Sequence, residues 1–233
     1  MRRRTPNDTV ILDEIPFQID LDKLKKELRI RPGHTTENDL QSLAEEAQAV
    51  GKPKALYKAA YVDSNGDDHI VVDGIQFTSR VLRVNLEEVR RVFPYVITCG
   101  TELEEWAESI DDMLQSYWAD TIKEVALRRA RTSLLDHLKK TYRLGKMSAM
   151  APGSLKDWPI QQQRPLFQLL GDVEEAIGAR LTSSMLMIPN KTISGIRFPT
   201  ESSFESCQLC PRERCPSRRA AYNPDLYEER FSH

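Results

Sequence analysis

The chain has 233 residues, 40% of them hydrophobic and 29% charged, with a formal net charge of −2 at pH 7. This composition predicts a globular protein, and the balance of charges argues against nucleic acid as a partner. The basic start Met1–Arg4 precedes no apolar run and no stretch approaches about 18 apolar residues, so we expect a cytoplasmic protein without signal peptide or membrane span.

The first third of the chain alternates short helical and extended patterns. We expect residues 1–9 to be loosely attached. Apolar spacing and turn residues predict extended segments at Val10–Leu12 and Ile15–Ile19, helices at Asp22–Leu28 and Asp39–Val50, and strands at Ala55–Val62, Ile70–Val72 and Ile75–Phe77. Asn65-Gly66 and Asp73-Gly74 are hairpin signals between these strands.

The middle of the chain contains the longest periodic segment. Before it we expect a helix at Leu86–Val92, a buried strand at Pro94–Thr98 and a helix at Glu102–Ser109. From Asp111 to Tyr142 the apolar residues recur at spacings of three and four, with acidic residues at the start and basic residues at the end. We predict one long central helix, whose Met, Tyr and Trp side chains belong to the core.

The last third predicts further helices and strands, followed by a tail. We expect a strand at Met147–Met150, a helix at Gln161–Leu170 capped by Asp157 with Pro159 in its first turn, a helix at Asp172–Gly178, and strands at Leu181–Ile188 and Thr192–Phe198 joined by the hairpin-like Pro189–Lys191. This irregular order predicts an α+β fold with a mostly antiparallel sheet packed with helices. We divide the chain into a domain at 1–199 and a cysteine-rich tail at 200–233 that wraps on it.

Two glycines are candidates for close approach by a ligand. Pro152-Gly153-Ser154 forms a turn before a helix, where outward backbone N–H groups suit a carboxylate or phosphate. The alternative is a purely structural junction. Ser194-Gly195 lies within a predicted strand, and such a glycine marks either curvature of the sheet or an approaching ligand.

The tail contains a cluster of cysteines. Cys207, Cys210 and Cys215 have a spacing that can place their thiolates on one metal ion or cluster, with Cys99 as the candidate fourth ligand and His233 or solvent as alternatives. Without an export signal, disulfides are not expected. A [4Fe–4S] cluster, zinc and unligated thiols all remain open, and we favour iron–sulfur on functional grounds.

The order of segments between Lys146 and Phe198 carries a family resemblance. A Pro-Gly loop and a helix are followed by Leu181-Thr182-Ser183-Ser184-Met185-Leu186-Met187-Ile188-Pro189 and then by Ile193-Ser194-Gly195. This order resembles the reactivation domain of cobalamin-dependent methionine synthase, which binds S-adenosylmethionine. The resemblance implies a curved antiparallel sheet and a cleft for this cofactor lined by Lys146, Ala151, Gly153, Ser154, Ser194 and Gly195. The arginine and tyrosine of the family's loop are replaced by Ala149 and Ser154.

The resemblance also implies a function. The family reactivates cobalamin by coupling one-electron reduction of Co(II) to methyl transfer from S-adenosylmethionine. This sequence has no Asp-x-His-x-x-Gly motif for binding cobalamin, so we expect it to act on a separate corrinoid protein, with a further protein as electron donor. The alternative is a metal-binding adaptor or electron relay that docks on the corrinoid protein and does not bind S-adenosylmethionine.

Overall fold

The computed structural model of the protein describes residues 3–4, 9–31, 36–201, 204–215 and 218–231. Of the residues expected to be loosely attached, Arg3–Arg4 form strand β1 and Thr9 begins strand β2. The others lie outside the described residues.

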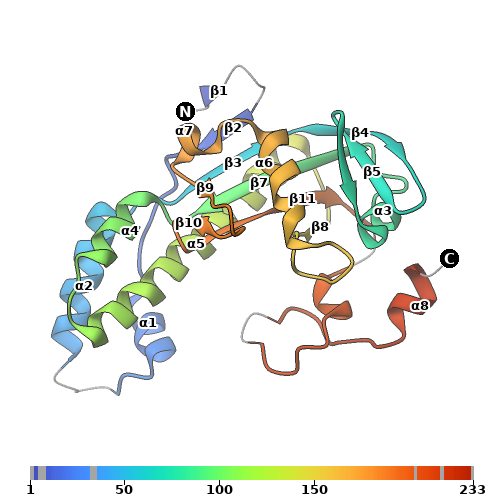
Figure 1. The fold of residues 1–233 in the computed structure, drawn as a ribbon. Coiled ribbons are helices and arrows are strands. Elements are labelled where there is room, and N and C mark those ends of the chain that lie inside the picture. Colours follow the sequence, from blue (N-terminus) through green and yellow to red (C-terminus); the bar gives the residue numbers. More distant parts are fainter. Residues whose placement is uncertain (1–2, 5–8, 32–35, 202–203, 216–217, 232–233) are drawn as a thin grey trace.

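A sheet of nine strands within the described ranges forms the centre of the molecule (Figure 1). Its middle strand, β7 (Arg91–Thr98), pairs with β11 (Thr192–Pro199) along one edge and with β3 (Lys54–Lys58) and β4 (Ala60–Asn65) along the other. Beyond β3 the sheet continues with β2 (Thr9–Leu12) and then β1. Beyond β4 it continues with β5 (His69–Val72) and then β6 (Ile75–Thr78). Beyond β11 lies β8 (Met147–Met150). All these pairings are antiparallel, which confirms the predicted α+β fold.

The predicted central helix is confirmed as α5 (Met113–Tyr142), 30 residues long. The Asp112 side chain accepts the N–H of Gln115 at 2.8 Å and so caps the helix. The second half of α5 packs on the aromatic face of β3 and β7. Its first half packs with α1 (Leu21–Leu28), α2 (Glu37–Val50) and α4 (Thr101–Glu108), seen together beside the sheet in Figure 1.

The expectation that all the large side chains of α5 are buried is wrong at its start. Trp118 is buried, but Met113 and Tyr117 are 87% and 59% exposed. Met113 and Tyr117 lie outside the buried cluster that α5 forms with α1, α2 and α4, so they meet solvent. No helix within the described ranges combines the length and apolarity needed to cross a membrane.

The opposite face of the sheet is covered by shorter helices. These are α3 (Arg80–Asn85), the 3-10 turn η1 (Ile160–Gln162), α6 (Gln163–Leu170) and α7 (Val173–Ile177). The C-terminal segment, described for residues 204–215 and 218–231, adds the 3-10 turn η2 (Ser206–Leu209) and α8 (Leu226–Phe231). Phe204 and Phe231 are buried in the same cluster as Trp158 and Phe77. The boundary at residue 199 stays a prediction.

Three predicted elements in the first half of the chain are corrected. The helix at Leu86–Val92 is wrong: α3 lies earlier, where the Ser79 hydroxyl accepts the N–H of Leu82 at 3.0 Å, and Val92 pairs with Ala60 inside the sheet. The single strand Ala55–Val62 is two strands, β3 and β4, which separate at Ala59. Ile15–Ile19 forms no strand, and the N–H of Ile19 donates to Gln48 Oε1 at 2.7 Å.

The strand predicted at Leu181–Ile188 is also wrong. It is a hairpin of β9 (Arg180–Leu181) and β10 (Met187–Ile188). A side-chain hydrogen bond closes the turn: the Thr182 hydroxyl accepts the N–H of Leu186 at 3.0 Å. Pro189–Lys191 is therefore no hairpin loop, because β11 pairs with β7 and β8 and not with β10.

Candidate functional site

The glycine loop (residues 151–160) is fixed to the core at Trp158. This side chain is fully buried and meets the Phe77 ring edge-on, with centroids 6.2 Å apart. Gly153 confirms the predicted turn, since its φ of +82° is the left-handed conformation that favours glycine. A Cβ at Gly153 would lie 2.5 Å from Ile160 Cδ1, so the two ends of the loop are in close contact.

The amides at the tip of the loop are already paired. The N–H of Gly153 donates to the Trp158 carbonyl at 2.7 Å, and the N–H and hydroxyl of Ser154 both donate to the Ala151 carbonyl, at 3.1 and 2.6 Å. The expectation of outward N–H groups is therefore wrong for Gly153 and Ser154. A ligand at the loop would not meet free amides of these two residues.

Asp157 ties the loop to a distant helix. Its carboxylate accepts the N–H groups of Arg80 and Val81 at 3.2 and 3.0 Å and the hydroxyl of Ser79, so it caps α3. The prediction that Asp157 caps the following helix is wrong, because α6 begins only at Gln163, after Pro159 and the turn η1. The loop is thus anchored at both Asp157 and Trp158, which leaves Gly153, Ser154 and Lys156 facing outward.

The glycine loop and the C-terminal segment enclose a hollow of about 880 Å³, called the main hollow below. Its walls are Val81, Gly153, Ser154, Leu155, Lys156, Asp157, Pro159, Ile160, Leu209, Cys210, Pro211, Tyr222, Asn223, Pro224 and Tyr227. A concave site of this size, with mostly apolar walls and few polar groups, suits a small organic ligand.

The structure does not bring the other predicted cofactor-binding residues to the main hollow. Ser194 and Gly195 are buried within β11. A Cβ at Gly195 would lie 2.4 Å from the Met150 carbonyl oxygen and 3.0 Å from Tyr95 Oη, so it is the protein itself that approaches this glycine. Lys146 lines a separate hollow of about 870 Å³.

Arg197 on β11 is buried and is paired in register with Ala149 on β8. Ala149 is the residue that replaces the arginine of the family's loop. The guanidinium carbon of Arg197 lies 5.3 Å from the centroid of the Tyr95 ring. Burial lowers the pKa of the Arg197 guanidinium. Arg197 is not a wall of the main hollow, whose cationic side chain among the described residues is Lys156.

An arginine also organises the cysteine loop. The Arg218 guanidinium donates to the carbonyls of Cys207 at 3.1 Å, Cys210 at 3.2 Å and Ala220 at 3.2 Å, and also to that of Arg212. The loop is therefore folded around a planar cation with several donors. Burial opposes ionisation of the Cys207 thiol, but hydrogen bonds from the backbone and guanidinium of Arg219 outweigh it and lower the pKa of Cys207.

Cys99 is not brought to the tail cysteines. It packs with Leu103 and Trp118 among the helices, and burial raises the pKa of its thiol to about 12. All four cysteines are free thiols. Within the described ranges, no three His, Cys, Asp or Glu side chains are grouped closely enough to hold a metal ion.

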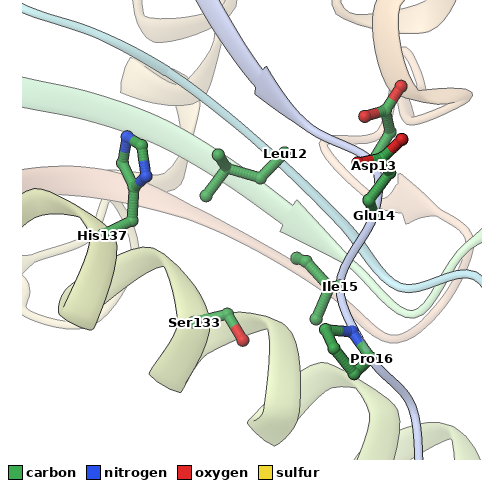
Figure 2. Close-up of a pocket in the computed structure, with 7 residues that line it drawn as sticks. All are labelled: Leu12, Asp13, Glu14, Ile15, Pro16, Ser133 and His137. Carbon is green, nitrogen blue, oxygen red and sulfur yellow. The ribbon is translucent and has the colours of Figure 1, made fainter. Parts of the chain in front are cut away.

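A third, smaller hollow of about 300 Å³ lies on the α5 side of the sheet. Figure 2 shows the residues that line it. His137 and Ser133 of α5 face the connection after β2, while the carboxylates of Asp13 and Glu14 point away from the imidazole. His137 Nε2 lies 2.9 Å from the Tyr57 hydroxyl, so this histidine has a structural partner. The glycine loop takes no part in this hollow.

No family model matches the sequence, and no curated protein matches it. The structure is similar to a crystal structure of the MetH reactivation domain bound to AdoHcy, with a TM-score of 0.59 and 14% sequence identity, over 88% of this chain and 82% of that one. The two chains share a fold. The resemblance inferred from the segments between Lys146 and Phe198 is thereby confirmed at the level of the fold.

Sequence reasoning missed half of the main hollow. Tyr222, Asn223 and Tyr227 come from the tail, which the sequence assigned only to cysteine chemistry. The available signal was the presence of two tyrosines beside Asn223-Pro224 in an otherwise polar, arginine-rich stretch. Ile160 and Lys156 were also missed, although both belong to the glycine loop.

Proposed function

We propose that this chain binds S-adenosylmethionine in the main hollow and supports reductive methylation of a Co(II) corrinoid carried by a separate protein. The observation that carries the proposal is the open hollow beside Gly153 and Ser154, in a fold shared with a domain whose crystal structure contains AdoHcy. AdoHcy is the sulfide that remains when S-adenosylmethionine has given up its methyl group.

The proposed reaction depends on how the protein positions the methyl donor and the cobalt, and it needs no acid–base catalyst. An electron from a separate donor protein reduces Co(II) to Co(I), and Co(I) then takes the methyl cation from the sulfonium and leaves AdoHcy. Donor and cobalt supply the reactivity, so the protein contributes by holding them in register. Gly153, Ser154 and Lys156 are exposed at the rim, which leaves the methyl donor accessible to a docked corrinoid protein.

The cysteine loop borders the main hollow at Cys210, and Arg218 holds the backbone of Cys207 and Cys210. The proposal includes no zinc ion or [4Fe–4S] cluster on Cys207, Cys210 and Cys215, because within the described ranges no three ligating side chains are grouped closely enough to hold one. The adaptor without S-adenosylmethionine is the second candidate function, favoured by the alanine at position 149 and the serine at position 154.

Calorimetry with AdoHcy and S-adenosylmethionine tests the proposal. We expect micromolar binding by the native chain, and Ile160→Trp to weaken it more than tenfold, because the indole fills the hollow. Leu186→Trp is the matched control, since Leu186 is 67% exposed and is not a wall of the hollow. Absence of binding by the native chain would favour the adaptor, and equal binding by the Ile160 variant would place the ligand elsewhere.

A further inference from the structure

The C-terminal segment supplies the aromatic part of the main hollow. The exposed residues Gly153, Ser154 and Lys156 of the glycine loop include no aromatic side chain. Across the hollow, Tyr222 and Tyr227 are 45% and 36% exposed, so each presents part of its ring to solvent. Exposed aromatic rings on a concave wall are poorly explained by packing alone, because burying them would stabilise the fold.

Both tyrosines are held by a fixed backbone. The Tyr227 ring contacts that of Phe231 with centroids 6.1 Å apart, and Phe231 is fully buried. Tyr222 precedes Asn223, whose N–H donates to the Gln208 carbonyl at 2.8 Å and so ties this stretch to η2. Rings on anchored backbone lose little freedom when a ligand binds.

Asn223, which follows Tyr222 in the sequence, is a polar wall of the main hollow. Asn223 Oδ1 accepts the N–H of Asp225 at 3.1 Å, while its Nδ2 has no acceptor in the part of the chain that the structure describes. An amide donor beside aromatic rings matches the flat face and acceptor edge of a purine. On the other wall, Lys156 offers a positive charge to a carboxylate.

We propose that Tyr222 and Tyr227 form the surface on which the adenine of the ligand stacks, with Asn223 donating to the edge of the base. This inference rests on the proposed function and extends it, because it makes the C-terminal segment part of the binding site. The amino-acid end of the ligand then extends towards Lys156, and the sulfonium lies at the rim beside Ser154.

The test measures binding of AdoHcy and of adenosine to variants of the full chain. Tyr222→Leu and Tyr227→Leu are each expected to weaken both probes about tenfold, and the double variant more, since base stacking on an aromatic ring contributes on this order. Tyr222→Phe and Tyr227→Phe are expected to bind within about twofold of the native chain, because stacking needs the ring and not the hydroxyl. Tyr61→Leu is the control: this tyrosine is 56% exposed but lies on β4 outside the hollow.

The outcomes separate the two proposals. If the native chain binds AdoHcy and the double leucine variant binds it equally well, the stacking surface is refuted and the proposed function stands. The stacking surface is also refuted if AdoHcy binding weakens while adenosine binding does not, because the tyrosines would then act away from the base. If the native chain binds neither probe, both proposals fail. The midpoint of thermal unfolding of each variant, compared with that of the native chain, distinguishes a loss of binding from a loss of the fold.

Discussion

Phe231→Ala is expected to lower the free energy of unfolding by about 3–5 kcal/mol, the range for truncating a buried phenylalanine. Phe231 is fully buried, and its ring centroid lies 5.8 Å from that of Phe204. It fixes α8, and through it Tyr227, against the core. Urea unfolding followed by circular dichroism measures the change, and we expect AdoHcy binding to weaken together with stability.

Tyr61→Ala provides the comparison for Phe231. This tyrosine is exposed, so we expect a loss of less than about 1 kcal/mol. If Phe231→Ala were as stable as the Tyr61 variant, α8 would not be packed on the core in solution. The aromatic wall of the main hollow would then have no fixed position.

Gly195→Ala is expected to lower the free energy of unfolding by about 2–3 kcal/mol, as overpacking of a tight interior does. The added Cβ would lie 2.4 Å from the Met150 carbonyl oxygen, so β8 must shift away from β11. For a chain of this length, the midpoint of thermal unfolding should fall by roughly 4–12 °C. Differential scanning calorimetry measures the shift.

Gly145→Ala is the matched control, because a Cβ at Gly145 meets nothing within 4 Å. We expect its unfolding midpoint to stay within about 2 °C of the native value. The pair also separates the two interpretations of Gly195 made from the sequence. Full stability with loss of AdoHcy binding in Gly195→Ala would show that a ligand, and not the neighbouring strand, occupies the space above this glycine.

Local patterns were sufficient for most of the elements. The periodicity of α5 and the alternation of β5 and β6 predicted these segments, because amphipathic spacing reports directly on burial. One failure has a cause distant in sequence, because Asp157 caps α3 across 77 residues and no sequence window contains both partners. The other cause is local: the hydroxyl of Thr182 accepts the N–H of Leu186, and the predicted strand is a hairpin.

The candidate site divides in the same way. Gly153 was predictable, because a Pro-Gly-Ser turn needs a residue that tolerates positive φ, and its φ is +82°. The glycine in Ser194-Gly195 likewise predicted a close approach to the backbone, and Met150 and Tyr95 are the groups that fill the space above Gly195. A glycine shows that something approaches the backbone but not what approaches it. The contribution of Tyr222 and Tyr227 depends on how the C-terminal segment folds back, which no local pattern encodes.

The most direct test of the central claim is a crystal structure of the full chain with AdoHcy. We expect electron density for the ligand in the main hollow, with the adenine against Tyr222 and Tyr227 and the sulfur at the rim beside Ser154. Ligand density along Ser194-Gly195, in the hollow beside His137, or absent at saturating AdoHcy would contradict the account.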